Sequence, residues 1–415
     1  MRHGSRPYDR GITMKKGFRI FDSDLHCVEP PDLWERYIDK RYQGHVVRTS
    51  ELTFEYVVLF FQIDNVVMPY VKQFFDRLPP GVTPAMIEKA MSDSPQVASL
   101  KRMTGGRYRQ FYERRWSGAA LLAGMDVEGV DVTVVFPTAG LLAMAVNDLE
   151  PDFAAAIARA YNDYLYELCR ADPHRLHGAA MISVHDVGRA IDESQRAVKE
   201  LGFKAIFLRP NLVHSRTWYD SYYDPLWDAI QDLDVPVAFH EGMGAELPHV
   251  GDCFGPNIFL RHIACHPMEM MLALMNFCGG GILAKYPRLR VAFLEGNIGW
   301  LPWLLDRMDD HYELSYGISQ ATLPEKPSFY FKRQCYLSAE CDEKMTAAVI
   351  QQVGADNFVT STDFPHPDSK YPRAMDTFIG KDDVSVEHKR RMLWDNCVTL
   401  YGMHEKLLPS ISDHE

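Results

Sequence analysis

Short apolar runs alternate with longer amphipathic stretches through most of this 415-residue chain. The runs are rich in β-branched and aromatic residues and are bounded by turn residues, which is typical of buried strands. An opening strand is expected near Phe18 and Phe21, just before the first acidic cluster. Seven further strands are predicted at residues 131–136, 178–183, 205–208, 235–240, 290–295, 335–338 and 357–363.

Helical patterns separate most of these strands. They cover residues 151–171, 187–201, 224–233, 268–286, 299–312 and 342–353, with a closing helix at 386–402. Strands that alternate with helices form a parallel sheet, and eight such repeats fit a closed barrel. A doubly wound open sheet is the alternative, but it usually has fewer strands, and no Gly-x-Gly-x-x-Gly follows the first one. We therefore expect an α/β protein with a (β/α)8 TIM barrel.

The repeating pattern is interrupted after the first strand, between residues 27 and 122. We interpret this stretch as a large insertion that forms a lid, within a single barrel domain of residues 17–402. Residues 1–16 and 403–415 are expected to be flexible tails. A solvated helical face is the simpler explanation for the basic residues of the insertion, and a lid that attracts an anionic substrate is the alternative. These residues are Lys101, Arg102, Arg107, Arg109, Arg114 and Arg115.

The composition limits the classes of partner. The net charge of −12 argues against nucleic acid and anionic membranes as partners. Eight scattered cysteines without a Cys-x-x-Cys pair, and no visible signal peptide, predict reduced thiols in the cytoplasm. The most apolar stretch, residues 268–284, contains Glu269, Asn276 and three glycines, so we expect a buried helix and no membrane span.

Acidic residues and histidines occur where several predicted strands end. Strand one ends at Asp24 and His26, strand five in His240, strand six in Glu295 and strand eight in Asp363. Each residue alone is more often a hydrogen-bonded polar side chain at the edge of a core. Active sites of barrels lie at the carboxyl ends of the strands, and four such ends on one rim indicate a metal site. Mixed imidazole and carboxylate ligands suit Zn, Mn or Fe.

Other polar residues near this rim have two interpretations each. His266 precedes Pro267 and either caps a helix or binds a second metal. Glu295 is either a ligand or a general base, and His366 lies close enough to Asp363 for orientation or acid–base work.

Substrate contacts are expected from the end of the fourth strand. Arg209 and Asn211 follow this strand on the same rim, and Arg209 could bind a substrate carboxylate through two hydrogen bonds. A salt bridge at the rim is the alternative role for Arg209.

Several of these motifs together resemble the amidohydrolase-related family, which includes aminocarboxymuconate semialdehyde decarboxylases and resorcylate decarboxylases. The resemblance extends from about Phe18 to Tyr401. It rests on Asp24-Leu-His26, the His240 strand, His266-Pro-Met-Glu, residues 293–307 and residues 361–368. It implies a metal barrel in which the ligands are Asp24, His26, His240 and Asp363.

Two positions depart from the family pattern. Many relatives begin with His-x-His, where this chain has Asp24, and the decarboxylases carry a catalytic histidine after strand six, where it has Glu295. With Asp363, three carboxylates would lie beside His26, His240 and His266, and such a charge suits two metal ions better than one. In this respect the chain resembles a smaller branch of dinuclear iron or manganese–iron hydroxylases.

Two classes of metal enzyme therefore remain open. In the first, one or two divalent ions (Zn, Mn or Fe) support hydrolysis or non-oxidative C–C cleavage of a small carboxylate- or carbonyl-bearing substrate. In the second, a dinuclear Fe or Mn/Fe centre hydroxylates a carboxylic acid or a terpenoid-like substrate. The chain is expected to assemble with itself or with a paralogue, and a non-catalytic barrel subunit is a third interpretation.

Overall fold

Eight parallel strands form the centre of the protein in the computed structural model, and their order is β1-β4-β5-β6-β7-β8-β9-β10. The structure describes residues 14–30, 32–43, 62–63, 66–67, 106–138, 140–144, 147–241, 250–254, 257–314, 323–366 and 368–403. The strands are β1 (Phe21–His26), β4 (Val132–Phe136), β5 (Leu176–Met181), β6 (Ala205–Leu208), β7 (Val237–Phe239), β8 (Val291–Phe293), β9 (Cys335–Ala339) and β10 (Phe358–Thr360). Every residue in them is buried, as in a sheet covered on both faces.

The first and last strands are joined mainly by side chains. Thr362 donates its backbone N–H and its hydroxyl to the carboxylate of Asp22, which is fully buried. The Ser23 hydroxyl donates to the carbonyl oxygen of Thr360 over 3.1 Å, and His26 N–H donates to the carbonyl oxygen of Phe364 over 2.8 Å. These bonds bring β1 and β10 together and make a nearly closed barrel, so the predicted (β/α)8 fold is confirmed.

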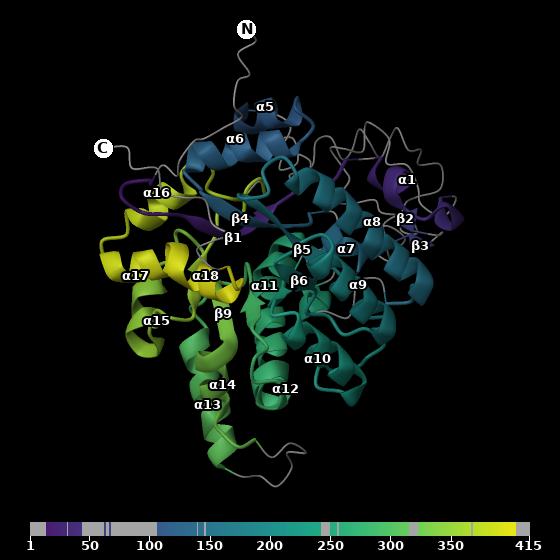
Figure 1. Ribbon diagram of the computed structural model, residues 1–415. Coiled ribbons are helices and arrows are strands. Elements are labelled where there is room, and N and C mark those ends of the chain that lie inside the picture. The colour runs from purple at the N-terminus through teal and green to yellow at the C-terminus, as the bar shows by residue number, and fades with distance from the viewer. Residues whose placement is uncertain are drawn as a thin grey trace.

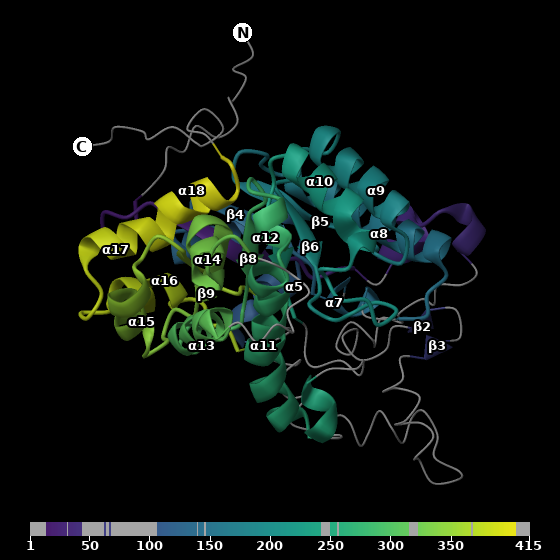
Figure 2. The same ribbon diagram turned by 90° about the horizontal axis from the view of Figure 1, so that it is seen from below.

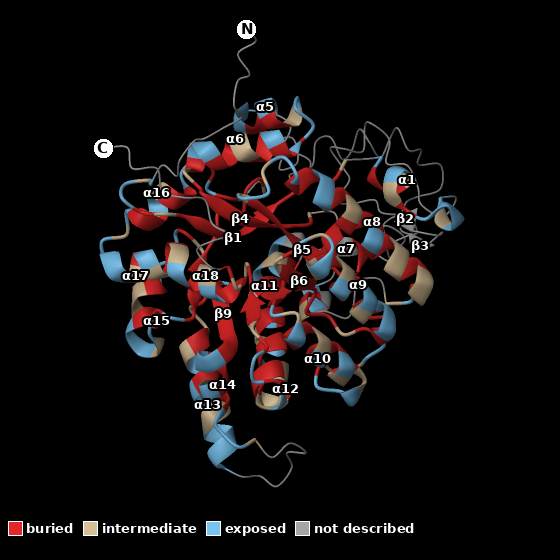
Figure 3. Ribbon diagram, in the orientation of Figure 1, coloured by how far each residue is buried: buried red, intermediate tan, exposed pale blue. Residues whose placement is uncertain are grey.

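Helices surround the strands, as Figures 1 and 2 show. On one side α8 (Pro151–Cys169), α9 (Val187–Lys199) and α10 (Asp224–Asp232) pack next to one another. The remaining helices are α1 (Leu33–Tyr37), α5 (Arg109–Tyr112), α6 (Gly118–Glu128), α7 (Gly140–Ala143), α11 (Ile258–Leu274), α12 (Ile282–Lys285), α13 (Leu301–Glu313), α14 (Pro327–Gln334), α15 (Thr346–Val353), α16 (Ala374–Ile379), α17 (Val386–Arg390) and α18 (Asn396–Leu400). Their inner faces are buried and their outer faces exposed (Figure 3), which is the pattern expected of amphipathic helices around a barrel.

Short elements complete the fold. They are the hairpin β2 (Gln62–Ile63) and β3 (Val66–Val67), the 3₁₀ turns η1 (Lys40–Tyr42), η4 (Gly106–Tyr108), η5 (Ser221–Tyr223) and η6 (Val250–Phe254), and the π-helical turns η7 (Met275–Gly279) and η8 (Arg391–Asp395). None of the helices in the described ranges is both long enough and apolar enough to cross a membrane.

Several predicted boundaries were wrong. Three strands end before the site residues that were assigned to them, because β7 stops at Phe239, β8 at Phe293 and β10 at Thr360. The helix expected from residue 268 begins at Ile258, so Pro267 lies inside α11 and does not mark its entry.

Much of the predicted insertion, including Lys101 and Arg102, lies outside the described residues. In the described part, Arg107 donates to the carbonyl oxygens of Ser369 and Tyr371, which attaches this region to the loop after β10. Arg109 pairs with Glu113 on the surface. The lid and the division into tails and a single domain stay predictions. Lys15 and Lys16, at the end of the predicted N-terminal tail, pair with Asp376.

Candidate metal centre

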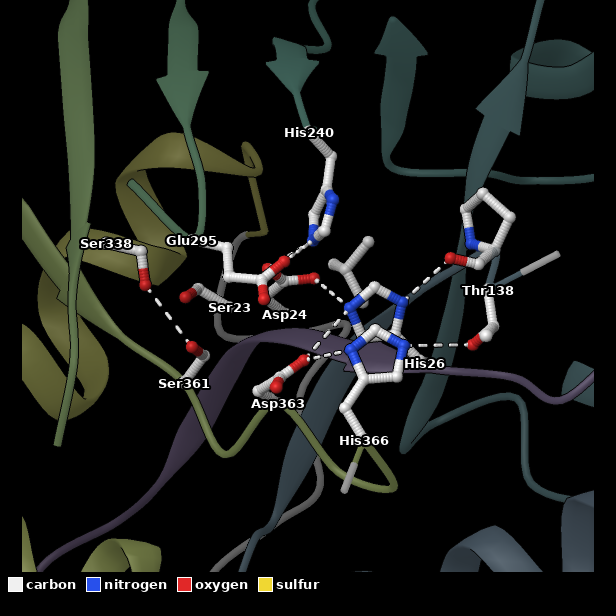
Figure 4. A network of polar contacts seen from close by, with 12 residues as sticks. Ser23, Asp24, His26, Thr138, His240, Glu295, Ser338, Ser361, Asp363 and His366 are labelled. Atoms are coloured by element: carbon white, nitrogen blue, oxygen red, sulfur yellow. Dashed lines mark hydrogen bonds and ion pairs between the residues drawn. The ribbon is translucent and has the colours of Figure 1, made fainter. Parts of the chain in front are cut away.

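The polar residues predicted at the strand ends converge in one buried cluster (Figure 4). Asp24 and His26 belong to β1, His240 directly follows β7, and Glu295 and Asp363 lie just beyond β8 and β10. Asp24, His26 and His240 are completely buried, and the side chains of Glu295 and Asp363 are 13% and 10% exposed. The barrel therefore brings together residues that are up to 339 positions apart in the sequence (363 − 24).

A bulge in β1 directs Asp24 into this cluster. The pairing of β1 with β4 shifts by one residue between Asp22 and Leu25, and Asp24 N–H donates to the carboxylate of Asp22 over 3.1 Å. Bulges often re-aim a side chain next to an active site. Asp24 and His26 both face the cluster, as the alternation along the strand predicted.

The first group of candidate ligands consists of Asp24, His26 and His240, whose ligand atoms lie within 4.8 Å of one another. Asp24 Oδ1 is 3.4 Å from His26 Nε2, and Asp24 Oδ2 is 3.0 Å from His240 Nε2. The other ring nitrogens are engaged: His26 Nδ1 is 2.8 Å from the carbonyl oxygen of Pro137, and His240 Nδ1 is 2.7 Å from that of Glu241. Because a carbonyl accepts only, both Nδ1 atoms carry the proton and both Nε2 atoms face the carboxylates.

The second group consists of His26, Glu295, Asp363 and His366. Asp363 Oδ1 is 3.3 Å from His26 Nε2 and 2.7 Å from His366 Nδ1. The rings of His26 and His366 are stacked, with centroids 3.9 Å apart. His26 therefore belongs to both groups.

The atoms that face one another in the first group fit a cation. Both carboxylate oxygens of Asp24 and the Nε2 atoms of His26 and His240 are buried and have no hydrogen-bond partner. Buried polar atoms without partners are costly, and imidazole nitrogens and carboxylate oxygens are the ligands that Zn, Mn and Fe use in proteins. The donor set is thus consistent with one divalent ion at Asp24, His26 and His240, and with a second at the group that contains Asp363.

Burial and charge set the protonation of these groups without a cation. Burial lowers the pKa of His26 to about 3, so its Nε2 keeps a free lone pair. Burial acts to lower the pKa of His266 as well, but the Glu295 carboxylate raises it to about 10. Burial acts to raise the pKa of Glu295, yet His266 holds it well below its usual range. His266 and Glu295, with Nε2 and Oε2 3.5 Å apart, thus form an ion pair.

Two site residues have unusual backbone conformations. Glu295 and Asp363 lie in the left-handed region, with φ of 51° and 52°. This region is unfavourable for residues with a Cβ, and such strain often occurs at functional sites. It also explains why both residues lie outside the strands that precede them.

The predicted substrate residue Arg209 lies on the expected rim but is buried. Its guanidinium donates to Glu241 over 2.8 Å, to the carbonyl oxygen of Leu141 over 2.7 Å and to Asn211 over 3.2 Å. Glu241 Oε2 is in turn 3.9 Å from His266 Nδ1. The structure therefore shows the buried salt bridge that was the alternative for Arg209, and a contact with substrate stays a prediction for Arg209 and Asn211.

Sequence reasoning missed the residues that support the cluster from the loop after β4. Thr138 Oγ1 is 3.2 Å from His366 Nε2, and Glu29 accepts hydrogen bonds from the backbone of Thr138 and Gly140. The signal for Glu29 was weak, because an acid between Val28 and Pro30 is typical of an exposed turn. It is only 2% exposed.

A family described as Amidohydrolase matches residues 45–403. The chain belongs to the amidohydrolase family. Among curated relatives, gamma-resorcylate decarboxylase of Polaromonas sp. is 27% identical over 68% of this chain and 86% of its own length. The 2-amino-3-carboxymuconate-6-semialdehyde decarboxylase of Dictyostelium discoideum is 22% identical over 64% of this chain and 72% of its own.

Solved structures of family members have the same fold. An amidohydrolase from Mycobacterium avium subsp. paratuberculosis superimposes with a TM-score of 0.69 at 20% identity, covering 93% of this chain and 99% of its own. A dihydroxybenzoic acid decarboxylase from Polaromonas sp., with bound manganese and 2-nitroresorcinol, gives 0.61 at 22% identity over 79% and 96% of the chains. The predicted family membership and the expectation of an enzyme are confirmed.

Proposed function

We propose that this protein is a metal-dependent enzyme that acts on a small carboxylate- or carbonyl-bearing substrate. It either cleaves a C–C bond of this substrate without oxidation or hydrolyses it. One observation carries the proposal: unpartnered imidazole and carboxylate atoms from β1 and from the end of β7 face one another in a buried cluster at the mouth of a barrel. The similarity to decarboxylases of the family supports C–C cleavage as the first reaction to test.

Asp24, His26 and His240 would hold the first ion, and Asp363 lies close enough to contribute. A divalent ion held there supplies Lewis acidity, which polarises a substrate oxygen or lowers the pKa of water. Manganese is the first candidate, because structural relatives are described with bound manganese.

Glu295 and His366 are the candidates for proton transfer. Decarboxylation breaks the bond to CO2 and leaves a carbon that must receive one proton, whereas hydrolysis requires a base that removes a proton from water. Glu295 is held by His240 at 3.3 Å and by His266 at 3.5 Å, and His366 is held by Asp363. Each group is thus oriented by charged neighbours and lies next to the candidate ligands.

A dinuclear oxygenase is the second candidate function. The observation that favours it is the presence of two ligand groups that share His26 and together contain Asp24, Glu295 and Asp363. Three carboxylates at one site neutralise the charge of two divalent ions better than that of one.

Metal analysis and turnover experiments separate the two functions. The protein is purified without added metal, its metal content is measured, and it is then loaded with Mn²⁺, Zn²⁺ or Fe²⁺ under argon. Release of CO2 from a panel of hydroxybenzoates and other small carboxylates is measured under argon and in air. Release under argon supports decarboxylation. Two equivalents of Fe or Mn, with oxygen consumption and a hydroxylated product, would replace the first proposal by the second.

A matched variant shows whether the activity belongs to the site. Asp363→Asn keeps the size of the side chain and removes one charge, so CO2 release should fall by at least about 100-fold. Asp382→Asn, at an exposed position between α16 and α17, serves as the control. Equal losses in both variants, or none in Asp363→Asn, would contradict the assignment.

A further inference from the structure

One short loop contacts both stacked histidines of the site. It follows β4, and in it the carbonyl oxygen of Pro137 accepts from His26 Nδ1, while Thr138 Oγ1 lies 3.2 Å from His366 Nε2. Figure 4 shows Thr138 on the side of the His366 ring that faces away from Asp363. The loop therefore determines which nitrogen of each ring faces the carboxylates.

The Thr138 hydroxyl has one proton, and the structure shows where it goes. Thr138 Oγ1 donates to the carbonyl oxygen of Cys27 over 2.7 Å, and a carbonyl oxygen cannot donate. The proton between Thr138 and His366 must therefore come from the imidazole. His366 carries a proton on Nε2, and its Nδ1 is the atom 2.7 Å from Asp363 Oδ1.

Glu29 holds this loop in place. Its Oε1 accepts from the backbone N–H of Thr138 over 3.1 Å and from that of Gly140 over 2.8 Å. A Cβ at Gly140 would lie 2.9 Å from Pro137 Cβ and 3.1 Å from Glu29 Oε1, so the loop packs too tightly there for any larger residue. A hydroxyl held this firmly can select one arrangement of its neighbour.

We infer that Thr138, anchored by Glu29, is a positioning residue that fixes the Nε2–H form of His366 and turns its Nδ1 towards Asp363 and Glu295. His366 is thereby held with Nδ1 beside Asp363, within the candidate ligand group of His26, Glu295, Asp363 and His366. The expected effect on metal binding rests on the proposed metal-dependent function. The claim that Thr138 fixes the Nε2–H form of His366 depends only on the hydrogen bond between these two residues. Partners that orient a metal-binding histidine typically change metal affinity by 10–100-fold when removed.

Three variants test the role of the hydroxyl. Thr138→Val removes it and keeps the branched shape, and Thr138→Ser restores it. Thr377→Val removes a hydroxyl that donates to the Arg373 carbonyl oxygen at an exposed position of α16. Binding of Mn²⁺ is measured by titration, with electron paramagnetic resonance of the free ion. We expect about 10–100-fold weaker binding in Thr138→Val, and wild-type binding in Thr138→Ser and Thr377→Val.

A second measurement detects the proton on His366 Nε2 directly. In protein labelled with ¹⁵N-histidine, the Nε2–H of His366 should give a solvent-protected proton signal that a His366→Gln variant identifies. Zn²⁺ serves as the diamagnetic probe for the loaded protein. The signal should disappear in Thr138→Val and return in Thr138→Ser, while circular dichroism shows that all variants are folded.

The two levels of the proposal fail in different ways. If Thr138→Val binds Mn²⁺ as tightly as wild type and keeps the protected signal, the positioning role is wrong, whatever the reaction. If wild-type protein binds neither Mn²⁺ nor Zn²⁺, the proposed function is wrong. The Nε2–H signal of His366 in metal-free protein, compared between wild type and Thr138→Val, then shows whether Thr138 fixes this form of the histidine.

Discussion

Asp24 contacts both histidines of the first ligand group, one through each carboxylate oxygen. Neither oxygen has a hydrogen-bond partner, so the charge of Asp24 is stabilised chiefly by whatever cation occupies the group. The residue therefore has little structural purpose without a metal. Its departure from the His-x-His pattern adds negative charge and should strengthen the preference for a divalent ion.

We predict that Asp24→Asn abolishes most of the stabilisation that Mn²⁺ gives. A ligand at 100 times its Kd stabilises a folded protein by about 2.7 kcal/mol, and the variant should lose the greater part of this gain. Thermal unfolding with and without MnCl2 measures it, with Asp228→Asn on the outer face of α10 as the control. An equal Mn²⁺-dependent shift in Asp24→Asn and wild type would rule out Asp24 as a ligand.

The lowered pKa of His177 predicts how the stability of the fold depends on pH. It lies on β5, 8% exposed, and burial lowers its pKa to about 4. Since the unfolded chain binds the proton near pH 6.5, the unfolded state holds more protons between pH 6.5 and 4, and stability falls as the pH falls through this range. At pH 4 the loss from this residue is about 3 kcal/mol.

Substitution isolates this contribution. His177→Gln is neutral throughout, so its urea-unfolding free energy should fall less than that of wild type between pH 7 and pH 4. His174→Gln, at an exposed position in the preceding turn, is the control. Parallel pH profiles for His177→Gln and wild type would show that His177 does not titrate in this way.

At the scale of elements, the bonds between β1 and β10 close the barrel. Asp22 is fully buried, and burial raises its pKa to about 8 although Thr362 donates to it. We predict that Thr362→Val costs about 2–3 kcal/mol, because a fully buried carboxyl group then loses a hydrogen-bond partner. Thr360→Val, which removes a hydroxyl bonded to the Ala339 carbonyl oxygen, should cost about 1 kcal/mol. Chemical denaturation tests both, and equal losses would contradict this role of Asp22.

The same elements show what the sequence could predict. Eight strands and their order along the chain follow from apolar runs between amphipathic helices, because burial on both faces leaves a continuous apolar signal. The strand ends do not follow, since hydrogen bonding stops where the backbone turns at Glu295 and Asp363, and no side-chain pattern records that turn. The candidate ligands could be proposed because each lies at the end of a strand or just beyond it.

Contacts between distant loops could not be predicted in this way. Glu29 and Thr138 are 109 positions apart and meet only because β1 pairs with β4. Arg209 was assigned to the correct rim, but its ion pair with Glu241 depends on how β6 and β7 lie together. Contacts of this kind form only when the barrel brings distant loops together, so the local periodicity of the sequence does not predict them.

At the scale of the whole molecule, the candidate ligands connect the two ends of the chain. Asp24 and His26 come from the first strand and Asp363 from the last, whereas β5 and β6 supply no member of the two ligand groups among the described residues. A bound ion would thus cross-link the side of the barrel where β1 meets β10. Closure there rests mainly on side chains, so this side should respond most to the metal.

We predict that Mn²⁺ slows amide hydrogen exchange at the carboxyl ends of β1 and β10 and leaves β5 and β6 nearly unchanged. Local opening at these ends separates the ligands and must release the ion, so its free energy rises by the free energy of Mn²⁺ binding. Local opening of β5 or β6 leaves the ligands together, so its free energy does not change. Exchange is measured by mass spectrometry with Mn²⁺ and with chelator, using Asp24→Asn as a protein that should show no difference. Protection spread evenly over all eight strands would mean that the ion stabilises the fold globally. Protection confined to other strands would show that the metal does not bind at Asp24, His26 and Asp363.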